Sequence, residues 1–319
     1  MNISNFLLPV VASLVGGFTL QADLEDHLKK IDYKCDEHHM RNIDYIYMIN
    51  LDQRPEKWQR SIAQLEPFGI LPYRFSAVNG WELSVETIND VGVKFSPGME
   101  GNFMASSYLV DGDYTHFIDS DDTRHDELIQ NYGQTYFCHC TAKGTIGCAL
   151  SHLSILQDAY ESNYQTIWIM EDDIDVRRDP RILSDLIDQL DLLVGKENWD
   201  VLFTDRDIKD ANGFYVESYG AAKRPDFVSR NHFALREDIG SEFRRIGARF
   251  GSHSMIWRRR GIKKILEFFK AHQIYLPYDM DYVLPHGIKF YTVTEDVVSN
   301  LPRAISDNGG PNYLNNTNN

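Results

Sequence analysis

The residues best suited to chemistry are three consecutive acids that follow an apolar run. Residues 167–176 read IWIMEDDIDV, so Glu171, Asp172 and Asp173 stand at the carboxyl end of a predicted buried strand, where open α/β sheets bind ligands. In extended backbone, side chains alternate between faces, which places Glu171 and Asp173 on one side and Asp172 on the other. Two carboxylates on one side suit a hard divalent cation such as Mg²⁺ or Mn²⁺, which can neutralise a diphosphate leaving group. Simple acidic capping of the strand end is the alternative.

A second group of polar residues stands where a predicted strand passes into a helix. In INLDQRPEK (49–57), Asn50 and Asp52 leave the strand, and Arg54 and Lys57 begin the helix. A helix N-terminus with two cations attracts phosphate, and Asn50 or Asp52 can hydrogen-bond a uracil or a ribose. Helix capping and ordinary surface charge are the alternative interpretation.

A cysteine and a histidine in GCALSH lie four residues apart on a predicted helix. The side chains of Cys148 and His152 can therefore meet. A Cys–His nucleophile also needs a third group that orients the histidine, and none is evident in the sequence. We expect Cys148 to pack in the core and His152 to make contacts near the helix start. A zinc site at Cys138-His139-Cys140 is disfavoured because ligands two apart lack the usual spacing.

Apolar periodicity predicts the elements that position these residues. Strands are expected at 43–52, 72–77, 166–170, 199–204 and 290–293. Helices are expected at 58–68, 149–160, 182–193 and 262–269. Strands that alternate with helices are typical of a mostly parallel α/β sheet.

Residues 81–143 lack this periodicity and are rich in Gly, Ser and Asp, which predicts a loop-rich insertion. Two further acid pairs fall in it, Asp111 with Asp113 and Asp119 with Asp121. The first is typical of a turn, and the second follows a weaker apolar run. Both therefore rank below the acidic triplet as a metal site.

The charge balance excludes one class of function. The 319 residues include 47 Asp and Glu against 32 Lys and Arg, a formal net charge of −15. Proteins that bind nucleic acid by neutralising phosphates need the opposite balance. The segment 223–264 is an exception, with twelve Lys or Arg against four Asp or Glu. It is either a solvated helix face or a basic wall for an anionic ligand.

The two ends are predicted to lie outside the domain. Residues 1–22 form a hydrophobic leader that is short for a spanning helix and resembles a signal peptide without a preceding Lys or Arg. A secretory leader, an anchor at the membrane edge and a simple tail remain alternatives, so localisation stays open between the cytoplasm and a membrane surface. Residues 23–42 are predicted to be a linker, 43–307 the domain, and 308–319 a disordered Asn-rich tail.

Several motifs, in this order, resemble glycosyltransferase family 25. They are INLDQRP, FSAVNG (75–80), GCALSH and WIMEDDIDV. Later segments are similar to the later blocks of that family: WDVLFTD (199–205), GSHSMIWRRRGIKKIL (251–266), LPYDMDYVL (276–284) and the terminal SDNGG (306–310). The resemblance covers about 43–308.

The resemblance implies a GT-A-like, Rossmann-type α/β fold in a single domain with an insertion. It implies metal-dependent transfer of a hexose, galactose or glucose, from a UDP-sugar to a glycan, lipopolysaccharide or protein-linked acceptor. Asp173 is implied as the most direct Mn²⁺ or Mg²⁺ ligand, with Glu171 beside it. The residues implied at the donor site are Asn50, Asp52, Arg54, Lys57, Glu171 and Asp172. Lys57 stands where an Arg is more usual, and Lys lacks the planar fork for a bidentate diphosphate contact.

Inverting displacement needs a carboxylate base near the acceptor hydroxyl. Asp279 and Asp281, in the late acidic block, are the candidates, and they share a face if the backbone is extended there. Arg258–Arg260 or Lys263 are expected to add positive charge near the diphosphate. His253 either lines the diphosphate or the metal, or is an ordinary packed histidine.

The expected partners are a nucleotide-sugar donor and a glycan or lipid-linked acceptor, with no nucleic acid and with membrane-surface association through the leader. The rival interpretation is a catalytically silent glycosyltransferase fold that acts as a binding or scaffold protein. A metal-dependent phosphoester hydrolase is less favoured, because no pair of His ligands accompanies the acidic triplet.

Overall fold

The structure is a computed structural model that describes residues 23–31, 33–97, 133–138, 140–210, 212–216, 224 and 232–316, with the backbone of 114–118 and 124–128. The leader at 1–22 and both alternative acid pairs, at 111–113 and 119–121, lie outside the described residues.

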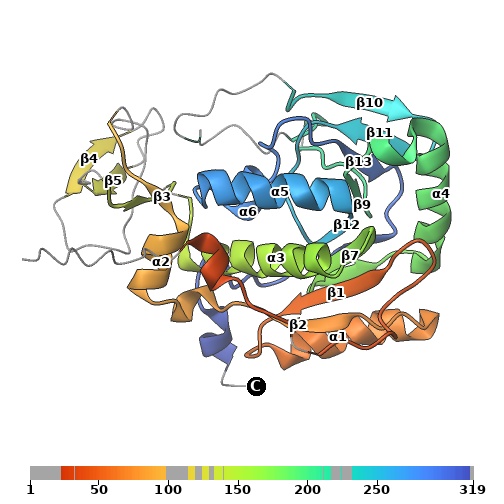
Figure 1. Cartoon of the computed structure of the whole chain (residues 1–319), viewed down its shortest axis with the longest axis horizontal. Coiled ribbons are helices and arrows are strands. Elements are labelled where there is room, and N and C mark those ends of the chain that lie inside the picture. The colour runs from red at the N-terminus through yellow and green to blue at the C-terminus, as the bar shows by residue number, and fades with distance from the viewer. Residues whose placement is uncertain are drawn as a thin grey trace, which may run out of the picture.

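An eight-stranded mixed sheet forms the centre of the molecule (Figure 1), in the order β10-β11-β13-β9-β12-β7-β1-β2. Its strands are β1 (Tyr45–Asn50), β2 (Tyr73–Ser76), β7 (Thr166–Glu171), β9 (Val201–Phe203), β10 (Arg236–Ile239), β11 (Phe243–Ile246), β12 (Ser254–Arg258) and β13 (Phe290–Val293). The pairing makes β11 and β12 antiparallel to the other strands. The carboxyl ends of β1, β7, β9 and β13 therefore meet at one edge. The predicted mixed, mostly parallel α/β fold is confirmed.

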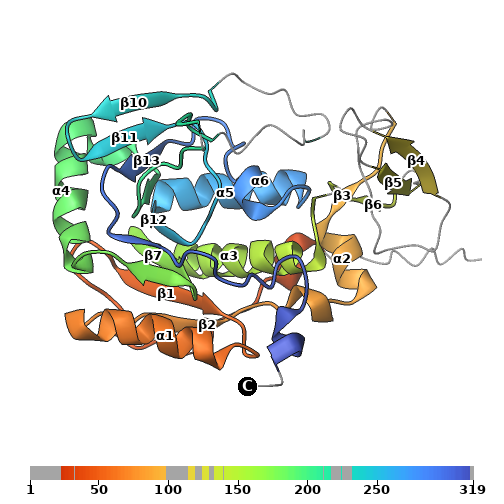
Figure 2. The same ribbon diagram turned by 180° about the vertical axis from the view of Figure 1, so that it is seen from behind.

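Helices cover both faces of the sheet in three layers (Figures 1 and 2). The first pair is α3 (Lys143–Glu161) and α5 (Arg259–His272), and the second pair is α1 (Pro55–Leu65) and α4 (Leu183–Val194). Alternate residues of β7 serve the two sides: Ile167 and Ile169 pack with α3 and α5, and Trp168 and Met170 with α1 and α4. A strand buried on both faces needs an apolar run, as TIWIM provides.

Shorter elements complete the described chain. Two-stranded ribbons pair β8 (Ile174–Val176) with β14 (Val298–Asn300), β3 (Val93–Lys94) with β6 (Thr135–Tyr136), and β4 (Tyr114–Ile118) with β5 (Arg124–Leu128). The short helices are η1 (Leu24–His27), η2 (Glu66–Phe68), η3 (Gly80–Glu82), α2 (Val85–Val91), η4 (Pro180–Ile182), η5 (Lys196–Asn198), α6 (Tyr278–Asp281) and η6 (Asn312–Asn316).

The described parts of both predicted end segments contact the domain. Leu24 of η1 is buried in the core, so the start of the expected linker packs on the domain. The expected disordered tail forms η6, and the Tyr313 hydroxyl accepts a hydrogen bond from Asn79 at 3.0 Å. Residues 301–316, here called the C-terminal strap, cross the sheet edge where the acidic triplet lies. The apolar pattern of the sequence could not predict the contact between the C-terminal strap and the domain, because polar side chains and backbone groups make that contact.

Candidate active site

Three carboxylates from distant parts of the chain line one cavity at the carboxyl edge of the sheet. Glu171 ends β7, Asp173 lies in the turn after it, and Asp279 comes from α6. The cavity holds about 230 Å³ and is also lined by Cys148 and Ser252. The prediction that Glu171 and Asp173 face the same side agrees with this geometry.

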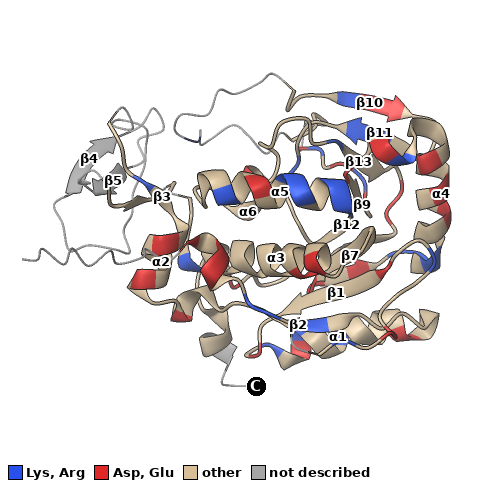
Figure 3. Ribbon diagram, viewed as in Figure 1, with Lys and Arg blue, Asp and Glu red and all other residues tan. Residues whose placement is uncertain are grey.

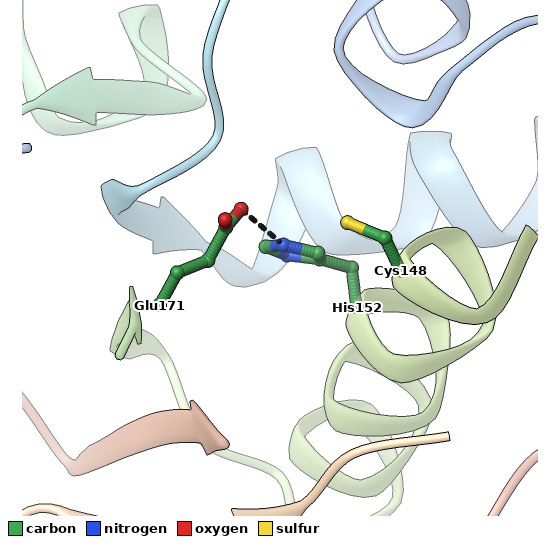
Figure 4. A group of neighbouring side chains, drawn as sticks. All are labelled: Cys148, His152 and Glu171. Carbon is green, nitrogen blue, oxygen red and sulfur yellow. Dashed lines mark hydrogen bonds and ion pairs between the residues drawn. The ribbon is translucent and has the colours of Figure 1, made fainter. Parts of the chain in front are cut away.

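Glu171 is held in place by two hydrogen bonds to one oxygen. Its Oε1 accepts from Ser252 Oγ at 2.6 Å and lies 3.1 Å from Nε2 of His152 (Figure 4). Burial alone would raise the pKa of Glu171, but the bonds from His152 and Ser252 outweigh it and lower the pKa to about 2. The carboxylate is therefore charged at neutral pH and fixed in orientation.

The GCALSH segment turns out to build this site, beyond what the sequence indicated. Gly147 lets α3 approach Gly80 so closely that a Cβ would come within 2.4 Å of the Gly80 backbone nitrogen. Ser151 accepts from the Val78 backbone N–H at 2.8 Å. His152, fully buried, stacks on Tyr278 with ring centroids 4.4 Å apart and so orients Glu171. The available signal in the sequence was the spacing of Gly147, Ser151 and His152, which places Ser151 and His152 about one turn beyond Gly147 on the same helix.

Cys148, His152 and Glu171 lie together, with potential ligand atoms within 4.8 Å of one another (Figure 4). Glu171 is thus a third group in contact with the histidine, and the sequence did not reveal this contact. Burial raises the pKa of the Cys148 thiol well above its usual value, which keeps it neutral and a poor nucleophile. The geometry agrees with the expectation that Cys148 is not a nucleophile.

Asp173 and Asp279 have no ion-pair partner among the described residues. Oδ1 of Asp173 is buried without a hydrogen-bond partner. Burial and the charge of Glu171 raise the pKa of Asp173, and burial likewise raises the pKa of Asp279 despite a 2.9 Å bond from the Gly251 N–H. Carboxylate oxygens that line one cavity are the ligand type that a hard divalent cation prefers, and such an ion would offset the cost of burying these carboxylates.

Asp172 faces the opposite way, as predicted, toward β1 and α1. Its Oδ2 accepts from Nδ2 of Asn50 at 2.6 Å, and its Oδ1 lies 3.9 Å from Nζ of Lys57. Burial raises the pKa of Asp172 to about 6, although Lys57 and Asn50 oppose that rise. Asn50 is 1% exposed and also accepts twice from Arg74. In this conformation these partners occupy its amide, and the expected bond to a uracil or ribose stays a prediction.

The two cations at the start of α1 hold the C-terminal strap. Arg54 Nε donates to Asp307 at 2.8 Å, and Lys57 Nζ donates to Asp307 at 3.3 Å and to the Ile305 carbonyl at 2.9 Å. Arg54 is 2% exposed, so its predicted phosphate contact is not available in this conformation. Asp52 remains largely exposed and accepts from Ser76 and Arg74.

A second cavity borders the first on the side of β1 and β2. Its apolar lining includes Ile49, Val78 and Trp81, and its polar lining includes Asp172 and the strap residue Asp307. The two cavities share Cys148, Glu171, Asp173 and Asn308, so they form one continuous groove across the acidic triplet.

Asp281 does not face this groove, which corrects the prediction that Asp279 and Asp281 share a face. The segment is helical (α6), and residues two apart on a helix point apart. Asp281 is fully buried and accepts from Arg224 at 2.8 Å and from two backbone N–H groups at 3.0 Å. It is a structural ion-pair residue and not a candidate base.

Most of the described cations of the basic 223–264 segment pair with acids elsewhere in the fold. Several of these cations lie on α5, whose basic residues are blue in Figure 3. Arg258 bonds Thr166 and Asp191, and Arg260 bonds Asp200. Thr166 begins β7 and Glu171 ends it, so Arg258–Arg260 lie at the edge of the sheet opposite the carboxylate-lined cavity and cannot contact a diphosphate there. Lys263 pairs with Glu267. That expectation is contradicted.

His253 lines the active-site cavity but is already paired. Its Nε2 lies 3.0 Å from Oδ2 of Asp205. Burial would raise the pKa of Asp205, but Arg249 and His253 outweigh this effect and lower the pKa. His253 therefore helps to fix the wall of the cavity.

The α/β fold with a carboxylate-lined groove at its strand ends is typical of enzymes and binding proteins for nucleotide-containing ligands. A sequence model described as glycosyltransferase family 25 (LPS biosynthesis protein) matches residues 43–281. The chain therefore belongs to glycosyltransferase family 25.

Individual relatives are distant and longer. A glycosyltransferase 25 family member of Aedes aegypti is 26% identical over 191 residues, which are 60% of this chain and 25% of that protein. One from Drosophila melanogaster is 28% identical over 151 residues, 47% of this chain and 19% of that protein. The human inactive glycosyltransferase 25 family member 3 is 23% identical over 202 residues, 63% and 27% of the two chains. The matched part of this chain thus spans about a quarter of these relatives. Within the described residues, no helix has the length and apolar character to cross a membrane.

Proposed function

We propose that the protein is a metal-dependent glycosyltransferase that moves a hexose, galactose or glucose, from a UDP-sugar to a glycan, lipopolysaccharide or protein-linked acceptor. The observation that carries the proposal is the group of three carboxylates, Glu171, Asp173 and Asp279, that lines one cavity. We assign the nucleotide to the cavity beside Trp81 and the transferred sugar to the cavity beside Asp279.

Glu171 and Asp173 would hold a Mn²⁺ or Mg²⁺ ion, and when bound that ion supplies positive charge for the departing diphosphate. His152 and Ser252 keep the Glu171 carboxylate aimed into the groove. Preorganised ligands of this kind lose little free energy to reorientation during the reaction.

Asp279 is the proposed general base. Its carboxylate accepts the proton of the acceptor hydroxyl while that oxygen bonds to the anomeric carbon and the bond to the diphosphate breaks. This displacement inverts the anomeric centre. Burial raises the pKa of Asp279, and a base with a pKa nearer to neutrality accepts a proton more readily.

The test is UDP release from a panel of UDP-sugars with Mn²⁺ or with EDTA, using wild type and Asp173→Ala. We expect metal-dependent release with one preferred sugar and a loss of at least about 100-fold in the variant, or roughly 2.7 kcal/mol. Asp175→Ala is the matched control, since Asp175 lies two residues on and pairs with Arg177 at 2.6 Å. It should release UDP at nearly the wild-type rate.

Two outcomes would contradict the proposal. Release that survives Asp173→Ala would move the metal site elsewhere. Folded protein that neither binds nor releases UDP would favour the alternative of a catalytically silent binding protein. Some relatives carry the word inactive in their names.

A further inference from the structure

A larger cleft lies beside the proposed active site, at the same edge of the sheet. It holds about 570 Å³ and is lined by residues that follow β9 and β13, including Asp207 and Thr294. Asn300 of β14 lines both this cleft and the cavity that contains Asp279. The cleft and the cavity that contains Asp279 therefore adjoin at Asn300.

The cleft is rich in cations although the chain as a whole is acidic. The four cations in its lining are Arg177, Arg206, Lys209 and Arg244. The buried acids of the same lining form ion pairs with arginines outside it: Asp205 with Arg249 at 2.9 Å, and Asp207 with Arg236. Arg177 and Arg244 pair with Asp175 and Asp238 outside the lining, so the positive charge open to a ligand comes from Arg206 and Lys209. Positive charge in a concave site raises the local concentration of anions.

Two of these cations are available to a ligand. The Arg206 side chain is 72% exposed, and its Nε lies 3.5 Å from Asp296, too far for a strong charge-assisted bond. Lys209 is exposed, and its Nζ lies 4.7 Å from the centre of the Tyr215 ring. Within the described part of the chain, Lys209 has no carboxylate at ion-pair distance. Hydroxyl and amide groups of Thr292, Ser299 and Asn300 add donors and acceptors suited to a polyhydroxylated ligand.

We propose that this cleft binds the acceptor and that the acceptor is a saccharide bearing a phosphate or a carboxylate, which Arg206 and Lys209 contact. The proposal rests on the proposed function, because it names the substrate class for the acceptor side of the same site. The anionic group anchors the acceptor, while a neighbouring sugar hydroxyl extends past Asn300 toward Asp279.

The test measures binding of glucose 6-phosphate, glucuronate and glucose by calorimetry, with the donor groove first saturated with UDP and Mn²⁺. We expect wild type to bind at least one charged sugar at least about 10-fold more tightly than glucose, and the preferred one identifies the anion. Arg206→Glu/Lys209→Glu should lose that preference. Arg181→Glu/Lys263→Glu is the matched control, with the same charge change at side chains that are 63% and 57% exposed and outside the cleft.

Equal affinity for glucose and the charged sugars would overturn the proposal, as would a preference that survives the double reversal at Arg206 and Lys209. Inorganic phosphate that binds as tightly as glucose 6-phosphate would also overturn it, because the cleft would then be a free-anion site. UDP binding is measured separately in every variant. If UDP fails to bind wild type, the proposed function fails. If Arg206→Glu/Lys209→Glu loses sugar binding but still binds UDP, the cleft is the acceptor site.

Discussion

Nε2 of His152 lies 3.1 Å from Oε1 of Glu171, and the two residues are brought together by α3 and the end of β7. Because His152 is fully buried against Tyr278, its ring cannot turn away without disturbing the core. The histidine is thus a positioning residue for the proposed metal ligand. Groups that orient ligands in this way typically contribute 10–100-fold to metal affinity or activity.

His152→Leu should therefore weaken Mn²⁺ binding by about 10–100-fold, measured by calorimetry with circular dichroism as a check on folding. His152→Gln should recover part of the affinity, because an amide N–H can still donate to Glu171. Thr145→Val is the control, since Thr145 lines the same cavity and its hydroxyl donates to the Ala142 carbonyl instead. Unchanged Mn²⁺ affinity in His152→Leu would show that His152 has only a packing role.

The two acids of α6 should separate activity from stability. Asp279→Asn should lower transfer by about 10²–10⁴-fold while the protein stays folded, because the base is lost. Asp281→Asn should instead lower the free energy of unfolding by about 3–5 kcal/mol, because Arg224 is left buried without its carboxylate. Transfer assays and urea melts of both variants decide the matter, and the reverse pattern would make Asp281 the better candidate base.

Sequence patterns predicted most of the strands with apolar runs, but they missed the fully buried SMIWR of β12 and the charged strands near the sheet edge. TIWIM and VLF are buried on both faces, so hydrophobicity alone indicates β7 and β9. The sequences REDI and FRRI of β10 and β11 carry exposed charge near the edge of the sheet and give no such signal. Edge strands are held by backbone pairing, which a hydrophobic pattern does not record.

The same limit applies to the site. Glu171 and Asp173 were found because they directly follow a buried strand. The contact between His152 and Glu171 joins two elements, and the choice between Asp279 and Asp281 depends on helical backbone at α6. Both are set by tertiary structure, which spacing along the chain cannot supply.

Close packing at the start of α3 should control the C-terminal strap. A Cβ on Gly144 would come within 2.5 Å of the Asn308 carbonyl oxygen and 2.6 Å of that of Asp307. Gly144→Ala should therefore displace the C-terminal strap and lower the free energy of unfolding by about 1–3 kcal/mol. It should also weaken UDP binding, because Ser306–Asn308 line the cavity beside Trp81 to which we assign the nucleotide. Gly309→Ala is the control, as its added Cβ meets nothing within 4 Å. Limited proteolysis and UDP calorimetry measure both effects, and equal behaviour of the two variants would exclude a role for this packing.

The buried pair of Asp205 and Arg249 should make stability depend on pH. The positive charges of Arg249 and His253 outweigh burial and hold the pKa of Asp205 below its usual range. Because the folded-state pKa lies below the unfolded value of about 3.9, the ionised carboxylate stabilises the fold at neutral pH, and this contribution is lost as the pH falls toward the folded-state pKa.

Asp205→Asn should thus cost about 3–5 kcal/mol at pH 7, since it leaves Arg249 buried and unpaired. The difference from wild type should shrink below about pH 4, in urea melts taken from pH 7 to pH 3. Asp205→Asn/Arg249→Met should cost less than the sum of the single variants, because each single change already breaks the pair. A deficit that stays constant with pH would mean that lost packing, and not lost charge, destabilises Asp205→Asn.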